Sequence, residues 1–157
     1  MTRKFWVPGE IALHPVALLG MAMTWCNDHY WKQHSAGWFT GKLSDVAGLA
    51  FFPLWVAALL ELALLLAGRR WLVRAPVMLA IVIATAVLFS SIKLSHAASN
   101  AYTGFVGRIR TATKYDSAAC ASTRNSVDPT DLLALPALGI GYWIVRKRDA
   151  VRGKSVR

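Results

Sequence analysis

The stretch VAGLAFFPLWVAALLELALLLAGRRWLVRAPVMLAIVIATAVLFSSIKL, residues 46–94, decides the fold. Its first part, Val46 to Ala67, has 22 residues and one charge, Glu61, and its second part, Leu72 to Leu94, has 23 residues with charges only near its ends. A helix rises about 1.5 Å per residue, so about 20 apolar residues cross the hydrocarbon core of a bilayer. Both parts are therefore predicted to be transmembrane helices, joined by a tight basic turn at 68–71.

The composition of the whole chain agrees with a membrane protein. Of its 157 residues, 55% are hydrophobic and 17% are charged, and the mean hydropathy is +0.40. The net charge of +10 comes from 18 Lys and Arg against 8 Asp and Glu. This length allows a single domain, and the apolar content is too high for a disordered basic arm. The basic tail after Val145 lacks the aromatic side chains on which bases stack, so no nucleic-acid partner is predicted.

Two weaker apolar segments flank the hairpin, and charge decides how they are placed. If both cross the membrane, 11 of the 18 cations lie on the side of the basic turn, 6 lie in the two loops on the other side, and Lys93 lies at the membrane edge. Cations concentrate on the cytoplasmic side of membrane proteins. We therefore predict an all-α membrane protein of the bacterial inner (plasma) membrane, a four-helix transmembrane bundle with both termini cytoplasmic and two extracytoplasmic loops. The predicted helices are about 11–30, 46–67, 72–94 and 130–146, the outer loops are 31–45 and 95–129, and the cytoplasmic tail is 147–157.

Local signals refine the helix ends. Asp128 and Pro129 are typical of an N-cap and a first helical turn, so the last helix is predicted to begin there. Ser44 or Asp45 is predicted to cap the second helix. Residues 104–110, in the long outer loop, could form a short strand or hairpin. Small residues predict close packing of the helices: Gly20, Thr24, Ala47, Gly48, Ala57, Ala58, Ala80, Ala84, Ser91, Gly139 and Gly141.

The two cysteines are predicted to lie on the same side of the membrane. Cys26 is at the outer end of the first helix, and Cys120 is in the second outer loop. In an oxidising compartment two such thiols can form a structural bridge. We predict a disulfide bond between them; the alternative leaves Cys26 as a small packing residue.

The outer loops carry the polar residues for which a binding role is predicted. Arg108 and Arg110 go against the cytoplasmic bias of cations, so an anionic partner or a lipid headgroup is a candidate ligand, and simple solubility is the alternative. The candidate binding residues are Asp28, His29, Lys42, Asp45, Lys93, His96, Arg108 and Arg110.

Imidazole and carboxylate groups on the outer side raise the question of a metal site. Such groups suit zinc, but their spacings do not match a recognised ligand pair, so no metal and no cofactor are predicted. A nucleophile beside a histidine is also missing from the pattern. The residues considered are Asp28, His29, His34, Asp45 and His96.

Charges inside the membrane allow two interpretations. An ionised side chain near the bilayer centre costs roughly 2.5 to 3.5 kcal/mol, so it is usually paired or functional. Residues at equal distances from the hairpin turn lie at similar depths in the membrane. This predicts two structural ion pairs, Glu61 with Arg74 and Asp45 with Lys93. In the functional alternative, Glu61 forms a cytoplasmic-side path for protons or cations with Glu10 and His14, which share one face of the first helix.

Three classes of function remain after this reasoning. The first is a non-enzymatic binding role, as an accessory subunit or an immunity-type protein that acts through its outer loops. The alternative is a small oligomeric transporter or ion-conducting protein that uses the intramembrane charges. The third is a membrane enzyme with an outward-facing Asp and His site. The expected partners are the lipid bilayer and either a protein partner or a second copy within the membrane.

Overall fold

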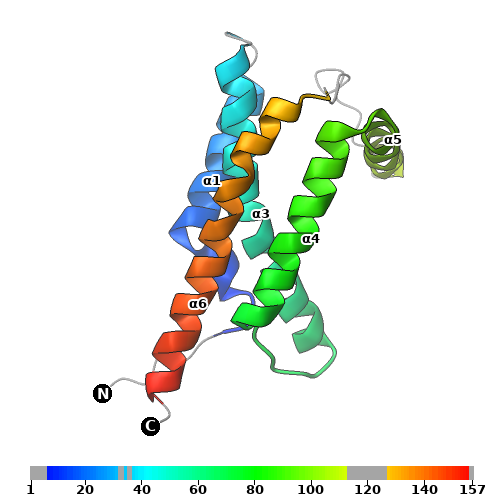
Figure 1. The fold of residues 1–157 in the computed structure, drawn as a ribbon. Coiled ribbons are helices and arrows are strands. Elements are labelled where there is room, and N and C mark those ends of the chain that lie inside the picture. Colours follow the sequence, from blue (N-terminus) through cyan, green and yellow to red (C-terminus); the bar gives the residue numbers. More distant parts are fainter. Residues whose placement is uncertain (1–6, 32–33, 35–36, 113–126, 156–157) are drawn as a thin grey trace. The chain divides into compact units, whose positions relative to one another are not determined.

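The computed structural model describes residues 7–31, 34, 37–112 and 127–155, and in these ranges every regular element is a helix. The predicted all-α class is confirmed. The side chains of residues 110–112 and 154–155 are not described. In chain order the helices, shown in Figure 1, are η1 (Glu10–Leu13), α1 (Pro15–Cys26), η2 (Asn27–Trp31), α3 (Trp38–Leu66), α4 (Ala75–Leu94), α5 (His96–Ala112), η4 (Pro129–Ala137) and α6 (Leu138–Ser155).

The chain divides into two compact units. The first unit consists of Met1–Thr85 and Leu133–Arg157, and the second of Ala86–Leu132. The first unit therefore holds α1, α3, α6 and the beginning of α4. The second unit holds the end of α4, all of α5 and the beginning of η4.

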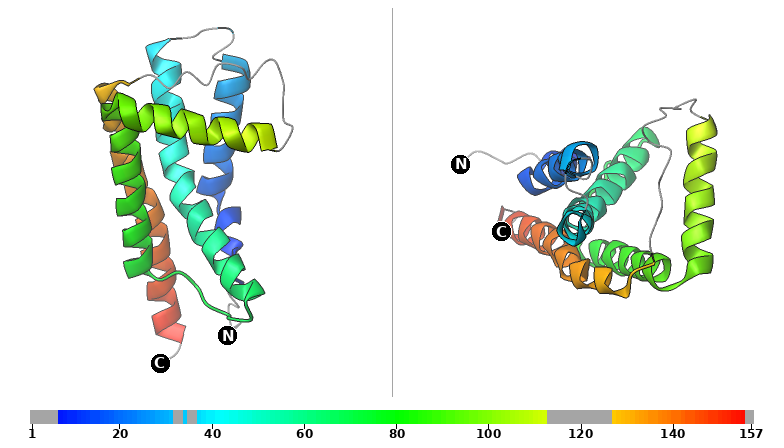
Figure 2. Two further views of the ribbon diagram at one scale, coloured as in Figure 1. Left: turned by 90° about the vertical axis from the view of Figure 1, so that its right-hand side faces the viewer. Right: turned by 90° about the horizontal axis from the view of Figure 1, so that it is seen from above.

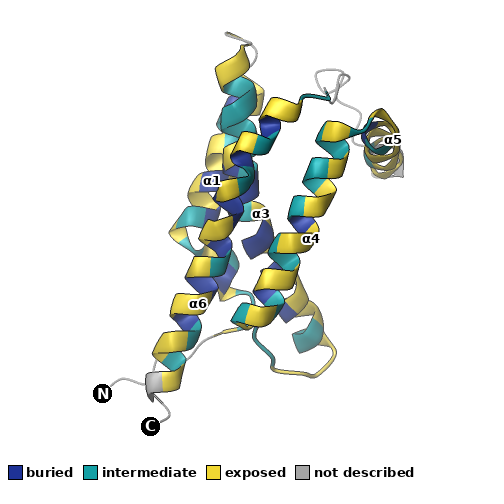
Figure 3. Ribbon diagram, viewed as in Figure 1, coloured by how far each residue is buried: buried dark blue, intermediate teal, exposed yellow. Residues whose placement is uncertain are grey.

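In the first unit, α3 packs against both α1 and α6 (Figures 1 and 2). Figure 3 shows the buried residues along the facing sides of α3 and α6, with exposed residues on the outer faces. Small residues bring the helices close, as predicted: a Cβ on Gly20 would lie 3.1 Å from the carbonyl oxygen of Ala47, and one on Gly141 would lie 2.7 Å from Cε of Met78. At Gly139 such a Cβ would meet open space. The hydrophobic core comprises Ile11, Ala17, Leu54, Ala57, Ala58, Val73, Met78, Ile144 and Val145.

Helix α3 begins eight residues before the predicted transmembrane segment. Its N-cap is Gly37, whose N–H donates to Oγ1 of Thr40 at 3.1 Å, while that hydroxyl donates back to the Gly37 carbonyl at 2.9 Å. The predicted cap at Ser44 or Asp45 is therefore wrong, and both residues lie inside the helix. The hydroxyl of Thr40 satisfies the first free backbone groups, so the helix starts in the polar stretch before the apolar one.

The first predicted helix is present, but it consists of three consecutive helical segments. The break between η1 and α1 falls at His14, whose Nδ1 accepts a hydrogen bond from the N–H of Val16 at 3.2 Å. Pro15 follows as the first residue of α1, a position where the missing N–H costs nothing. After Cys26 the helix widens into the π-helical segment η2.

Two helices, α3 and α4, are long and apolar enough to cross a membrane. Only 39% of the apolar window of α3 and 11% of that of α4 is buried within the protein. Apolar side chains that stay exposed around a helix are typical of a protein surrounded by lipid. By comparison α1 has 12 residues, fewer than the roughly 20 that a span needs on its own.

The second unit corrects the predicted long loop. Residues His96–Ala112 of the predicted loop form the helix α5, so the short strand or hairpin considered for residues 104–110 is wrong. Gly104 and Gly107 suggested a turn, but each is tolerated inside a helix at a modest cost. The predicted start of the last helix is close: η4 begins at Pro129, and Oδ1 of Asp128 accepts a hydrogen bond from the N–H of Thr130 at 2.9 Å. The predicted cytoplasmic tail is also helical as far as Ser155.

Candidate functional site

A buried carboxylate, that of Glu61 near the end of α3, joins three other segments of the first unit. Its side chain is 0% exposed. Oε2 accepts a hydrogen bond from the N–H of Gly9 at 2.8 Å, and Oε1 accepts from the N–H of Val73 at 2.8 Å and from Nη2 of Arg148 at 3.0 Å. The segment before η1, the connection between α3 and α4, and helix α6 therefore meet at one group. We call these four residues the Glu61 cluster.

Helix α6 contributes two charged residues to this region. The side chain of Arg148 is 5% exposed, and its Nη2 also donates to the carbonyl of Val73. Oδ2 of the next residue, Asp149, accepts a hydrogen bond from the N–H of Ala75 at 2.8 Å. Ala75 is the first residue of α4, where backbone N–H groups lack helical acceptors and the helix dipole is positive. Asp149 therefore caps α4 from a helix that lies far away in sequence.

The ion pair predicted from the hairpin, Glu61 with Arg74, is replaced by Glu61 with Arg148. Arg74 is exposed, whereas its neighbour Val73 is fully buried. Counting residues from the turn placed Arg74 at the correct depth, but depth does not decide which way a side chain points. In the sequence, Arg148 is one of several cations of the last helix, and the pattern contains no signal that distinguishes it from Arg146 or Lys147.

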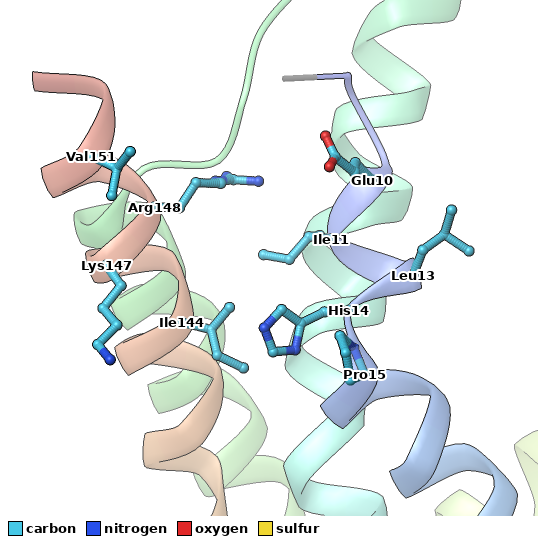
Figure 4. Close-up of a pocket in the computed structure, with 9 residues that line it drawn as sticks. All are labelled: Glu10, Ile11, Leu13, His14, Pro15, Ile144, Lys147, Arg148 and Val151. Carbon is cyan, nitrogen blue, oxygen red and sulfur yellow. The ribbon is translucent and has the colours of Figure 1, made fainter. Parts of the chain in front are cut away.

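A cavity of about 470 Å³ lies between the first helical segments and α6. Figure 4 shows Arg148, Ile11 and His14 extending into the space between these segments. The buried Nε of Arg148 has no hydrogen-bond partner in the described part of the chain. The cavity is lined by Glu10, Ile11, Leu13, His14, Pro15, Ile144, Lys147, Arg148 and Val151.

The path considered for protons or cations is divided in the structure. Glu10 and His14 both line the cavity, but each is used locally: Oε2 of Glu10 accepts from the N–H of Val7 at 3.2 Å, and His14 caps α1. Glu61 does not line this cavity, because it is held within its own cluster. Arg148 both lines this cavity and contacts Glu61, and the path itself stays a prediction.

At the opposite end of α3, large aromatic side chains are exposed beside polar groups. The ring of His29 stacks on Trp25 with centroids 5.1 Å apart, and Nζ of Lys42 lies 5.8 Å from the ring centroid of Trp38. Two hydrogen bonds join η2 to α3 beneath them: Asn27 Nδ2 donates to the carbonyl of Thr40 at 2.7 Å, and Ser44 Oγ donates to Oδ1 of Asp28 at 3.0 Å. We call the exposed aromatic residues the aromatic end: Trp25, Tyr30, Trp31, Trp38 and Phe39.

Four of the predicted binding residues belong to this end of the first unit. Asp28 and His29 are exposed on η2, and Lys42 and Asp45 are half-buried in the first turns of α3. The structure thus places Asp28, His29 and Lys42 in the same part of the first unit as the exposed aromatic residues.

The other four predicted binding residues belong to the second unit. Nζ of Lys93 lies 2.6 Å from Oδ2 of Asp131. His96 and Arg108 are exposed on α5, and Arg110 is in the same helix with an undescribed side chain. The predicted pair of Asp45 with Lys93 would join the two units, and it stays a prediction.

The residues considered for a metal site and the two cysteines of the predicted disulfide are divided between the two units. In the described ranges, there is no group of three or more His, Cys, Asp or Glu side chains that could hold a metal ion. Cys26 is half-buried at the end of α1. Cys120 lies outside the described residues, so the bridge to Cys26 stays a prediction.

No protein-family model, curated protein or solved structure matches this chain. Its function must therefore be inferred from its own residues.

Proposed function

We propose that the chain is a small multi-pass protein of a bacterial inner membrane, with both termini in the cytoplasm. Helices α3 and α4 supply two spans. The Glu61 cluster supports the proposed sidedness, because it ties Gly9, Val73 and Arg148 together at one end of the first unit. These are the three segments whose cations place them on the cytoplasmic side by the positive-inside rule.

The remaining two spans of the proposed four-helix bundle are formed by the helical segments that pack on α3. The run from η1 through α1 to η2 covers residues 10–31, which is long enough to cross as a unit. Helix α6, preceded by η4, packs along α3 and ends in basic residues. Their packing on α3 supports the proposal that both cross the membrane with it.

Within this membrane we propose a non-enzymatic binding role, as an accessory subunit or an immunity-type protein. The observation that carries the proposal is the aromatic end. Five large aromatic side chains are exposed there beside Asp28, His29 and Lys42. Tyr and Trp provide most of the binding energy in many protein interfaces, particularly where polar groups lie close by.

The Glu61 cluster favours binding over ion transport. Both oxygens of Glu61 accept hydrogen bonds, and the carboxylate is paired with a buried guanidinium. A group that carries protons or cations has to exchange partners during each cycle. Glu61 has the environment of a structural residue, so the polar surface at the aromatic end is the better candidate for function.

Site-specific photo-crosslinking in growing cells tests this proposal. A benzophenone amino acid would replace Phe39, at the aromatic end, or Leu59, an exposed residue in the apolar part of the same helix. We expect a discrete crosslinked protein product from position 39 and not from position 59, weakened when Trp38 is changed to Ala. The partner is either another membrane protein or a second copy of this chain, and mass spectrometry of the product distinguishes them.

A flux assay decides the alternative. The purified protein, reconstituted in liposomes, would be compared with Glu61→Gln. Ion or proton flux that disappears in a folded Glu61→Gln protein, together with no product from position 39, would replace binding with transport.

A further inference from the structure

The helix α5 has an apolar stripe that the second unit leaves exposed. Tyr102, Phe105 and Ile109 recur at spacings of three and four residues, which places them on one helical face. Phe105 is 63% exposed and Ile109 is 48% exposed. Before Tyr102, the same face continues with the small residues Ala98 and Ala101. We call Tyr102, Phe105 and Ile109 the α5 stripe.

Charged and polar residues occupy the rest of the helix in a regular order. At 100° per residue, Arg108 lies about 60° from Phe105, at one border of the stripe. Its side chain is exposed. The opposite face carries Asn100 and Thr103, which are also exposed. A long basic side chain beside an apolar face can lay its methylene groups on lipid and keep its charge among headgroups.

The direction of α5 is set by the end of α4. Leu94 is the last residue of α4 and His96 the first of α5, so a single residue, Ser95, separates them. Oγ of Ser95 accepts a hydrogen bond from the N–H of Ala98 at 3.4 Å, which caps the new helix. Figure 2 shows α5 running across the end of α4. A helix that runs across the end of a membrane span lies along the membrane surface.

The end of α4 within the second unit also presents apolar side chains outward. Val87, Leu88 and Leu94 are each more than half exposed. Near the junction of α4 and α5, Lys93 forms an ion pair with Asp131. Exposed apolar side chains on the end of α4 are thus followed along the chain, after Ser95, by those of the α5 stripe.

We propose that α5 is an interfacial helix, with the α5 stripe inserted among the lipid chains and Arg108 in contact with anionic phospholipid headgroups. The ligand is the membrane surface itself. This inference requires that α4 crosses the membrane, and it is independent of the binding role proposed for the aromatic end. Seventeen residues with a polar face are typical of a helix that lies in the interface and does not cross.

Spin-label accessibility in nanodiscs tests the placement. A ketone-bearing amino acid at position 105, 109 or 103 would carry the label, so both native cysteines are kept. We expect labels at Phe105 and Ile109 to collide with oxygen, which concentrates in lipid, more than with a water-soluble nickel complex. A label at Thr103 should show the reverse preference. Equal access of the nickel complex to all three positions would overturn the proposal.

The same labels detect the other possible occupants of the stripe. Strong spin–spin broadening at position 105, lost on dilution with unlabelled protein, would show that a second copy covers the stripe and would also overturn the proposal. The result expected is no broadening.

The headgroup contact has its own control. In nanodiscs of phosphatidylcholine with phosphatidylglycerol, we expect the label at position 105 to lie deeper than in phosphatidylcholine alone. Arg108→Gln should abolish this difference, and Arg70→Gln, an exposed arginine of the first unit, should not. A difference that survives Arg108→Gln would overturn the assignment of Arg108.

Discussion

Two ion pairs between distant parts of the chain, Glu61 with Arg148 in the first unit and Lys93 with Asp131 in the second, differ in how they are surrounded. In the first unit, Glu61 is 0% and Arg148 is 5% exposed, and the carboxylate also accepts two backbone N–H groups. In the second unit, Lys93 is 12% and Asp131 is 10% exposed, at the junction of two helix ends. The charges of the first pair are therefore stabilised only by protein groups, while the side chains of the second pair are still partly exposed.

This difference matters because a buried charge without a partner is costly. Removing one member of a fully buried pair leaves the other charge uncompensated, typically at about 3 to 5 kcal/mol, whereas a pair at a surface contributes about 0 to 1 kcal/mol. The Glu61 pair also holds the connection between α3 and α4 at Val73. It should dominate the stability of the first unit, and the Lys93 pair should act locally.

The largest effect is expected from Glu61→Gln. The amide keeps the shape of the side chain but leaves Arg148 as a buried, unpaired cation, so unfolding should become easier by about 3 kcal/mol. The measurement is the unfolding free energy in mixed micelles titrated with SDS, followed by helical circular dichroism. The yield of the crosslinked product from position 39 should then decrease only in proportion to the amount of folded protein. A loss below about 1 kcal/mol would mean that the pair is not the main support of this unit.

A smaller loss is expected when both charges are removed together. In Glu61→Leu with Arg148→Met no ion remains buried, so the double variant should regain about half of the stability lost in Glu61→Gln. The backbone groups of Gly9 and Val73 still lose their partner, and recovery is therefore incomplete. The same titration gives the comparison. A double variant less stable than Glu61→Gln would place the cost in the backbone bonds and not in the charge.

Lys93→Met should cost less again, about 1 kcal/mol, because Asp131, although largely buried, keeps 10% of its side chain exposed, whereas the side chain of Glu61 has no exposed part. The effect should be local. Hydrogen exchange followed by mass spectrometry should show faster exchange in peptides that cover η4, with little change in peptides that cover α3. Equal acceleration in both regions would show that the second pair supports the whole molecule.

The smallest effect is expected at the partner that the sequence suggested. Arg74 is exposed, so Arg74→Gln should change the unfolding free energy by less than about 0.5 kcal/mol. The SDS titration described for Glu61→Gln provides the direct comparison. A loss as large as that of Glu61→Gln would restore the pairing predicted from the hairpin.

The apolar helices were predictable because their signal is additive. In 46–67 and 72–94 each residue contributes hydropathy independently of its neighbours, and the helices α3 and α4 follow closely. The helix α5 was missed because two glycines in 96–112 suggested a loop, while its helical evidence lies in the spacing of only three large apolar residues. The early start of α3 depends on one local bond, that of Thr40 to Gly37, which competes with equally plausible caps at Ser44 and Asp45.

The sequence by itself determined that this is an all-helical chain with two helices apolar enough for a membrane, because helix length and side-chain hydropathy are local properties. It also marked Glu61 as a charge in need of a partner. Only the tertiary structure decided that the partner is Arg148, 87 residues away, and that Asp149 caps α4. Charge and depth can be counted along a chain, but an ion pair requires that two side chains point toward each other. That direction is set by the packing of α6 against α3.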